Sequence, residues 1–272
     1  MTSVLYDAPG PRARRLANIV SVVVFVLIAA GLAWLVFALA APRVTAAGAV
    51  QPGLIDSSRW DIFLDPAIWR RIGGALVGTL AMAGVGAVLA LAIGFLFSFI
   101  RSARNPFIRV PSTTVLEFFR GMPVLLMMLF ILLVFGVAPF WAGVWALAIY
   151  NGAVIGEVLR AGVAALPRGQ HEAGLAIGLS ALRVRILIEL PQAVRNMLPA
   201  IVAQLIVLVK DTALAYVISY DELLKTVVTG ISNYVGNRYF FSLFLVVLVI
   251  YLGVNLLLSW IARALARRVT VE

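Results

Sequence analysis

The sequence of 272 residues contains no cysteine and a single histidine, His171. The lack of cysteine excludes disulfides, thiol catalysis and cysteine-ligated metal centres, and one histidine argues against a histidine-ligated metal site. Charged residues are also scarce at 12% of the chain, whereas hydrophobic residues make up 63%. Because so much apolar surface cannot fit inside a water-soluble core, the composition predicts an all-α integral membrane protein.

Six apolar segments are long enough to cross a bilayer, which takes about 20 residues. They run from 17 to 41, 70 to 100, 111 to 135, 139 to 163, 196 to 219 and 239 to 265. The first follows three arginines and ends in Ala38-Leu39-Ala40, as a signal peptide does. Its apolar run exceeds the roughly 7 to 15 residues of such a peptide, so we expect a retained anchor followed by a five-helix core.

Basic residues give the expected orientation. With the N-terminus inside, 14 arginines fall in inner loops and chain ends, against six basic residues in outer loops. The positive-inside rule therefore predicts that both termini are cytoplasmic and that the segments 42–69 and 220–238 form outer loops. We expect residues 1–69 to comprise the N-terminus, the anchor and the outer linker, and residues 70–272 to comprise the core. The net charge of +10 then reflects membrane sidedness and does not imply a nucleic acid partner.

The cytoplasmic segment 164–195 is expected to form two short helices. Pro167 and Gly169 break the preceding helix, Glu172 is expected in the first turn of the next, and Gly178 can end it. Ser180 can cap a second helix that Pro191 stops. Amphipathicity alone is equally consistent with a helix that only covers the inner face of the bundle.

The spacing in this segment is more specific than its amphipathicity. Glu172-Ala173-Gly174 is followed by Gly178, then by Ile188 and by Leu190-Pro191. This spacing resembles the cytoplasmic signature of ATP-binding-cassette (ABC) importer permeases, except that Gly174 replaces an alanine. The resemblance implies that these residues dock on a separate ATPase and couple its motion to the membrane helices.

Two charged clusters lie inside the predicted spans, where an ionisable group costs on the order of 3 kcal/mol. Glu117 and Arg120 are three residues apart and can pair on one helix face. An alternative to a site role is a structural ion pair, with Arg120 reaching toward the interface. Lys210 and Asp211 are adjacent, so they face different directions. Asp211 is either a site residue or part of a structural contact between helices.

The clusters extend the resemblance. Phe-Phe-Arg-Gly-x-Pro around Arg120, Glu157-Val-Leu-Arg160 and Lys210-Asp211-Thr212 resemble the permeases of polar amino-acid ABC importers, over about residues 70 to 268. The opening Val4–Gly10 is similar to actinobacterial glutamate-uptake permeases. The resemblance implies the type I importer fold and a substrate site containing Glu117, Arg120, Lys210, Asp211 and Thr212. It also implies an ABC ATPase dimer, a second permease subunit, an extracytoplasmic binding protein and a bacterial cytoplasmic membrane.

No catalytic residue is expected in this chain. It contains no Gly-x-x-x-x-Gly-Lys-[Ser/Thr], His-Glu-x-x-His or Gly-x-Ser-x-Gly motif, so we expect ATP to be hydrolysed on another chain and no cofactor to be bound here. The leading hypothesis is an importer subunit for glutamate or a related amino acid. The alternative is an ion-coupled carrier or channel that uses the same buried charges. An intramembrane enzyme is the least favoured class.

Overall fold

The computed structural model describes residues 10–44, 48, 50–101 and 105–270, with side chains placed up to residue 264. Residues 4 to 9 of the predicted N-terminal similarity and Arg104, one of the predicted inner charges, lie outside the described residues. The chain divides into two compact units, Met1–Leu64 and Asp65–Glu272. The second unit begins five residues before the predicted start of the core.

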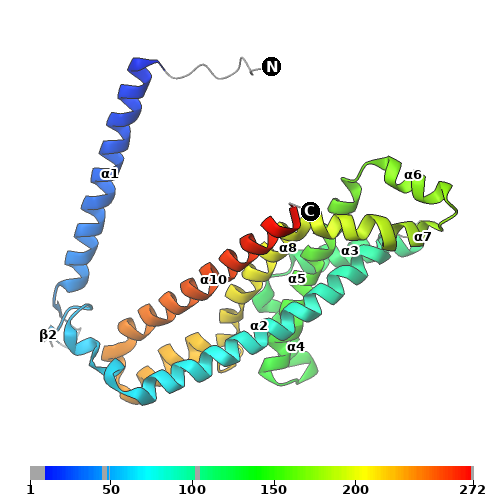
Figure 1. Ribbon diagram of the computed structural model, residues 1–272. Helices are drawn as coiled ribbons and strands as arrows, with labels where there is room; N and C mark the ends of the chain where they lie inside the picture. Colours follow the sequence, from blue (N-terminus) through cyan, green and yellow to red (C-terminus); the bar gives the residue numbers. More distant parts are fainter. Residues whose placement is uncertain (1–9, 45–47, 49, 102–104, 271–272) are drawn as a thin grey trace. The chain divides into compact units, whose positions relative to one another are not determined.

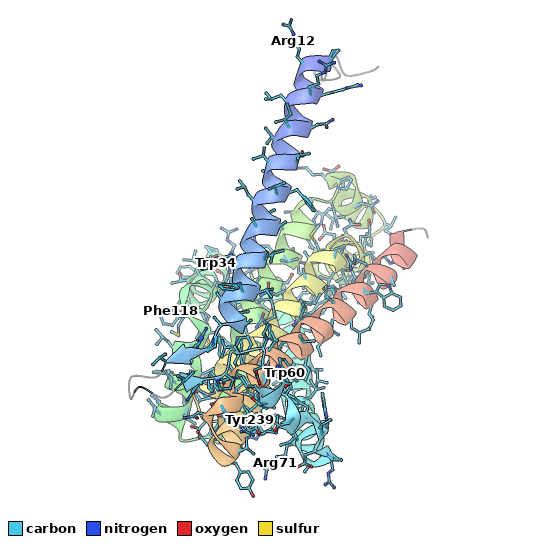
Figure 2. The ribbon with its side chains drawn as sticks, turned by 90° about the vertical axis from the view of Figure 1, so that its left-hand side faces the viewer. Arg12, Trp34, Trp60, Arg71, Phe118 and Tyr239 are labelled. Atoms are coloured by element: carbon cyan, nitrogen blue, oxygen red, sulfur yellow. The ribbon has the colours of Figure 1, made fainter. Side chains whose placement is uncertain are left out.

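The first unit consists mainly of the anchor helix α1 (Pro11–Ala40). Pro11 stands at its first position, where a missing N–H costs nothing. None of its residues is buried, and its apolar side chains, Trp34 among them, point outward from the helix axis (Figure 2). An apolar helix of this length is suited to a bilayer. Short elements follow: β1 (Arg43–Val44), β2 (Val50–Gln51), η1 (Ser57–Arg59) and η2 (Asp61–Leu64).

Every secondary-structure element in the described residues of the second unit is a helix (Figure 1). Its first half contains α2 (Pro66–Ile100), α3 (Pro106–Gly121), α4 (Val124–Phe135) and α5 (Pro139–Ala164). Its second half contains α6 (Arg168–Ala176), α7 (Ala181–Val184), η3 (Arg185–Glu189), α8 (Leu190–Asp211), η4 (Thr212–Tyr216), η5 (Leu224–Ile231), α9 (Ser232–Val235), η6 (Asn237–Tyr239) and α10 (Phe240–Thr270). The predicted all-α class is therefore confirmed.

Helices α2 and α5 pack closely because small residues face each other. A Cβ atom on Gly152 would lie 2.7 Å from Ile93, and one on Gly94 would lie 2.7 Å from Ile155. A Cβ atom on Gly156 would lie 3.2 Å from the Gly94 carbonyl oxygen, so Gly152 and Gly156 both allow close packing between these two helices. Between α5 and α8, the Gln204 amide donates a 2.8 Å hydrogen bond to the Asn151 side chain.

The third predicted span is not one straight helix. Helices α3 and α4 meet at an angle of 103°. Met122 is extended because the following Pro123 disfavours a helical backbone there, and Pro123 has no N–H to continue the α3 ladder. Within the described residues, five helices are long and apolar enough to span a membrane, and the bent pair gives a sixth if it counts as one span.

The predicted outer loop 220–238 is also not an open loop. It folds into η5, α9 and η6, and η5 buries Val227, Val228 and Ile231. Glu222, just before η5, is fully buried and accepts hydrogen bonds from the Leu224 and Lys225 N–H groups and from the Tyr251 hydroxyl. Burial raises the pKa of Glu222 above its ordinary value. The apolar pattern of this segment thus serves packing against the bundle.

Candidate functional site

The segment 164–195 contains a short helix that ends in a defined turn. Helix α6 stops at Ala176, and Gly178 has a φ of +84°. The Gly178 N–H donates to the Leu175 carbonyl at 3.0 Å, and the Leu179 N–H donates to the Gly174 carbonyl at 3.2 Å. This pair of bonds is the Schellman motif, in which glycine takes the left-handed position at little cost. The prediction that Gly178 ends the helix is confirmed.

Helix α6 rests directly on the next helical element. Gly174 is buried, and a Cβ atom added there would lie 2.7 Å from a Val184 methyl group and 3.1 Å from Ile188. His171 Nδ1 lies 2.9 Å from Glu189 Oε1, beside this contact. The absence of a side chain at Gly174 therefore lets α6 sit closer to η3 than alanine would allow.

Two details of the predicted segment were wrong. Helix α6 begins at Arg168, directly after Pro167, with Gly169 inside it, so Glu172 is its fifth residue and not in the first turn. Pro191 does not stop the second helix. The π-helical η3 precedes it, and Pro191 occupies the first turn of α8, where its missing N–H is tolerated. Ser180 does cap α7, because its hydroxyl accepts from the Arg183 N–H at 3.4 Å.

Consequently, α7, η3, α8 and η4 form one helical element of 36 residues, Ala181–Tyr216. Its length is about 50 Å at 1.5 Å per residue. Helix α6 packs on the first part of this element, near the C-terminal end of α2 (Figure 1). Lys210, Asp211 and Thr212 lie in its last part. Ile188, Leu190 and Pro191 of the predicted coupling segment therefore share one element with the charges predicted to bind substrate, and α6 packs on its first part.

The signature residues divide into a buried and an exposed set. Gly174 and Leu190 are buried within the protein. Glu172, Ala173 and Pro191 are exposed, and Ile188 is half-buried. Ile177, next to the Schellman turn, has 75% of its surface exposed. An exposed acid and exposed apolar side chains on a helix outside the candidate spans form a surface suited to another protein.

The first charged cluster forms the predicted ion pair. Arg120 Nη1 lies 2.9 Å from Glu117 Oε1 in the last turn of α3. Both side chains are partly exposed, and the pair lies directly before the bend at Pro123. The pairing itself is the contact expected of an i, i+3 pair and does not distinguish a binding role from a structural one.

In the second cluster, the adjacent charges have different surroundings, as their spacing predicts. Lys210 lines a cavity of about 330 Å³ together with Tyr251 and Asn255 of α10. Asp211 is half-buried, and its carboxylate forms no hydrogen bond or ion pair with another described residue. Thr212 is fully buried and donates a 2.7 Å hydrogen bond to the Val209 carbonyl. Within the described part of the chain, no hydrogen bond or ion pair connects this cluster with Glu117 or Arg120.

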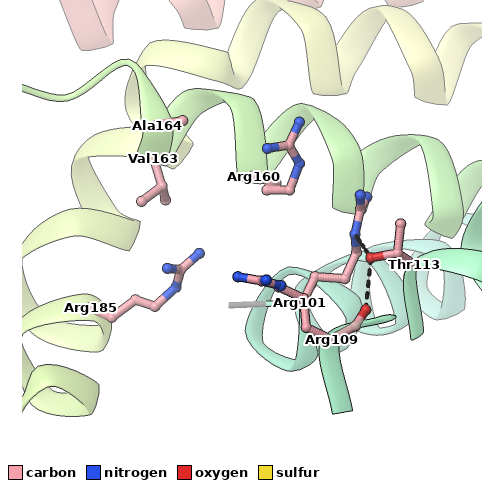
Figure 3. A pocket seen from close by; sticks show the side chains of 7 residues that line it. All are labelled: Arg101, Arg109, Thr113, Arg160, Val163, Ala164 and Arg185. Carbon is pink, nitrogen blue, oxygen red and sulfur yellow. Dashed lines mark hydrogen bonds between the residues drawn. The ribbon is translucent and has the colours of Figure 1, made fainter. Parts of the chain in front are cut away.

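Another charged cluster could not be found from spacing alone. Glu157 accepts hydrogen bonds from Arg160 at 2.6 and 3.0 Å and forms an ion pair with Arg101 at the end of α2. The i, i+3 spacing of Glu157 and Arg160 indicates one pair, but Arg101 is 56 residues away along the chain. Arg101 and Arg160 line a cavity close to η3 (Figure 3).

These features define a class of protein: a multi-pass helical membrane protein with a short, exposed helix, α6, packed on a long helical element that carries charge. A family model described as the binding-protein-dependent transport system inner membrane component matches residues 86–271. The chain belongs to this family and is a permease subunit of the amino-acid ABC importers.

Individual relatives agree with this assignment. The chain is 36% identical over 225 residues to the glutamate transport system permease protein GluD of Corynebacterium glutamicum, covering 79% of this chain and 81% of the relative. It is 35% identical over 213 residues to the glutamine transport system permease protein GlnP of Escherichia coli, covering 76% and 95%. A crystal structure of an amino acid ABC transporter superposes with a TM-score of 0.68 at 27% identity, covering 79% and 99%.

Proposed function

We propose that this chain forms half of the translocation pathway of an ATP-driven importer for glutamate or a related acidic or amide amino acid. A second permease subunit, identical or homologous, supplies the other half. An ABC ATPase dimer drives transport from the cytoplasmic side, and an extracytoplasmic binding protein delivers the amino acid. The chain itself performs no chemistry and lies in a bacterial cytoplasmic membrane with both termini inside.

One observation carries the coupling part of the proposal. Helix α6 lies on the first part of the helical element Ala181–Tyr216, and Lys210 and Asp211 lie in its last part. A displacement of α6 by a docked ATPase acts through Gly174 and Val184 on this element. The element is continuously helical across η3 and Pro199, so the displacement reaches the charged cluster without an intervening loop.

The charges suit the proposed substrate. An amino acid presents an ammonium group and a carboxylate, and glutamate adds a second carboxylate. Asp211 can accept the ammonium group, and Arg120 or Lys210 can bind a carboxylate through charge-assisted hydrogen bonds. The Asp211 carboxylate forms no hydrogen bond with another described residue, so it is available for a ligand. Glu117 balances Arg120 until a carboxylate competes for it.

Docking is tested by crosslinking, which the lack of cysteine makes direct. Ala173→Cys, on the exposed face of α6, is expected to crosslink to the ATPase encoded with this permease. Ser57→Cys in the outer linker is the matched control and is expected not to react with it. Glu172→Lys should reduce co-isolation of the ATPase while the permease stays in the membrane. Efficient crosslinking through Ser57→Cys, with none through Ala173→Cys, would reverse the proposed orientation.

A further inference from the structure

A cavity lined by arginines lies where the ends of α2, α3 and α5 meet η3. It encloses about 320 Å³, and its lining includes Arg101, Arg109, Arg160, Arg185 and Thr113. Arg185 extends from the η3 side toward the arginines of the α2–α3 corner (Figure 3). These residues come from four separate elements, so only the fold brings them together.

The cavity has more positive than negative charge. Glu157 is the acidic partner of two lining arginines, Arg101 and Arg160. The nearest other carboxylates are already engaged: Glu117 pairs with Arg120, and Glu189 lies 2.9 Å from His171. The carboxylate of Glu189 also acts electrostatically on Arg185, so four guanidinium groups against two carboxylates leave a net charge of two at the cavity wall.

Two of the arginines have donors left for a ligand. Arg185 Nε is buried and has no hydrogen-bond partner, and its Nη2 donates to the Ser98 carbonyl only at 3.5 Å. The guanidinium of Arg109 makes no hydrogen bond or ion pair to another described residue. Guanidinium groups gathered in one cavity repel each other, and the unmet donor on the buried Arg185 Nε is costly, whereas Arg109 is exposed and presents its donors to solvent or to a ligand. An oxyanion that bridges them removes both costs.

We propose that this cavity binds a phosphate anion, and that its source is the headgroup of an anionic phospholipid. The surface of α3 supports the lipid source. Arg109 and Thr113 line the cavity, whereas Phe107, Val110 and Phe118 of the same helix are 58% to 86% exposed. An acyl chain lying on this apolar face places its phosphate at the cavity mouth. In the proposed orientation, the lipid belongs to the inner leaflet.

A bound phosphate would connect the coupling segment with helix α3. Arg185 belongs to η3, on which α6 rests, and Arg109 belongs to the first turn of α3. A phosphate that accepts hydrogen bonds from both would hold the coupling element against the α2–α3 corner. This role concerns a ligand other than the transported amino acid, and it does not depend on which amino acid that is.

The test is a binding titration of the purified full-length chain in neutral detergent. Phosphatidylglycerol, phosphatidylcholine and soluble glycerol phosphate are added separately, and bound ligand is counted by native mass spectrometry. Phosphatidylglycerol should bind at least about tenfold more tightly than phosphatidylcholine, because the latter carries a compensating cation. Arg109→Gln and Arg185→Gln should each weaken phosphatidylglycerol binding about tenfold, the effect of one charge-assisted hydrogen bond.

Matched variants make the result decisive. Arg70→Gln removes one exposed charge at the other end of α2 and should leave binding within about twofold of the unmodified chain. Arg185→Lys retains the charge but loses the fork and should fall between Arg185→Gln and the unmodified chain. Equal binding of the two lipids, or equal effects of Arg70→Gln and Arg109→Gln, would overturn the site. Glycerol phosphate binding as tightly as phosphatidylglycerol would overturn the lipid source.

Discussion

Replacing Gly174 by alanine tests how closely α6 is attached to the membrane helix. The added Cβ atom would lie 2.7 and 3.0 Å from the two Val184 methyl groups. Val184 is fully buried and β-branched, so it cannot rotate away freely. Overpacking of this kind costs about 1 to 3 kcal/mol. Exchanging glycine for alanine within a helix recovers up to about 1 kcal/mol, so the net effect on α6 lies between about 0 and 2 kcal/mol.

Gly169→Ala is the matched control, because it lies in the same helix and its Cβ atom would meet no atom within 4 Å. Both variants gain the same helix propensity from the change of glycine to alanine. The difference in α6 stability between them therefore measures the cost of the contact with Val184, about 1 to 3 kcal/mol. Hydrogen exchange of α6 amides should therefore be about 5- to 150-fold faster in Gly174→Ala than in Gly169→Ala. Amino-acid uptake should also be lower in Gly174→Ala than in Gly169→Ala.

Removing the Val184 methyl groups should reverse the faster hydrogen exchange of α6 that Gly174→Ala causes. Val184→Ala combined with Gly174→Ala should bring α6 exchange back toward that of Val184→Ala alone, with a coupling energy of about 1 kcal/mol or more. Equal exchange rates in the Gly174→Ala and Gly169→Ala proteins would refute the close contact. A double variant that is no better than Gly174→Ala would show that the clash lies elsewhere.

Three further outcomes are expected. Burial raises the folded-state pKa of Glu222, so its stabilising contribution is complete below its ordinary value of 4.5 and is lost as the pH rises through the raised pKa. Thermal unfolding in detergent should show this loss, and Glu222→Gln should remove it; an unchanged pH profile in that variant would contradict the assignment. Asp211→Asn should lower amino-acid uptake more than a hundredfold while assembly is retained. The substitution removes the proposed contact between Asp211 and the substrate ammonium group, and breaking a buried charge pair costs about 3 to 5 kcal/mol. Near-normal uptake would assign Asp211 to helix packing. Arg183→Cys should resist an impermeant thiol reagent in intact cells, and its labelling would reverse the proposed topology.

Long apolar runs and local spacings could be interpreted from the sequence alone. The spans 70–100, 139–163 and 239–265 lie close to α2, α5 and α10 because a bilayer demands a minimum apolar length. The Gly178 turn and the Ser180 cap follow from local backbone chemistry, and the structure confirms both. The Glu117–Arg120 pair was predictable for the same reason, since three residues bring two side chains to one helix face.

Features that depend on distant contacts could not be predicted in this way. The sequence shows that Pro123 weakens a helix, but not that the chain turns by 103° there. Pro191 reads as a helix end, yet the π turn of η3 accommodates it, because packing of α6 on this element outweighs local propensity. The arginine-lined cavity unites residues from four elements, and only the folded bundle brings them together.

The most direct test of the proposed transport function is uptake into proteoliposomes that contain this chain, its partner permease and their ATPase. Labelled glutamate, glutamine and arginine are supplied with the binding protein, with ATP on the ATPase side or with an ion gradient alone. The proposal predicts uptake that requires ATP, favours glutamate or glutamine over arginine, and is lost in Glu172→Lys. Uptake by this chain without the ATPase, driven by the ion gradient, would contradict it and establish the carrier alternative.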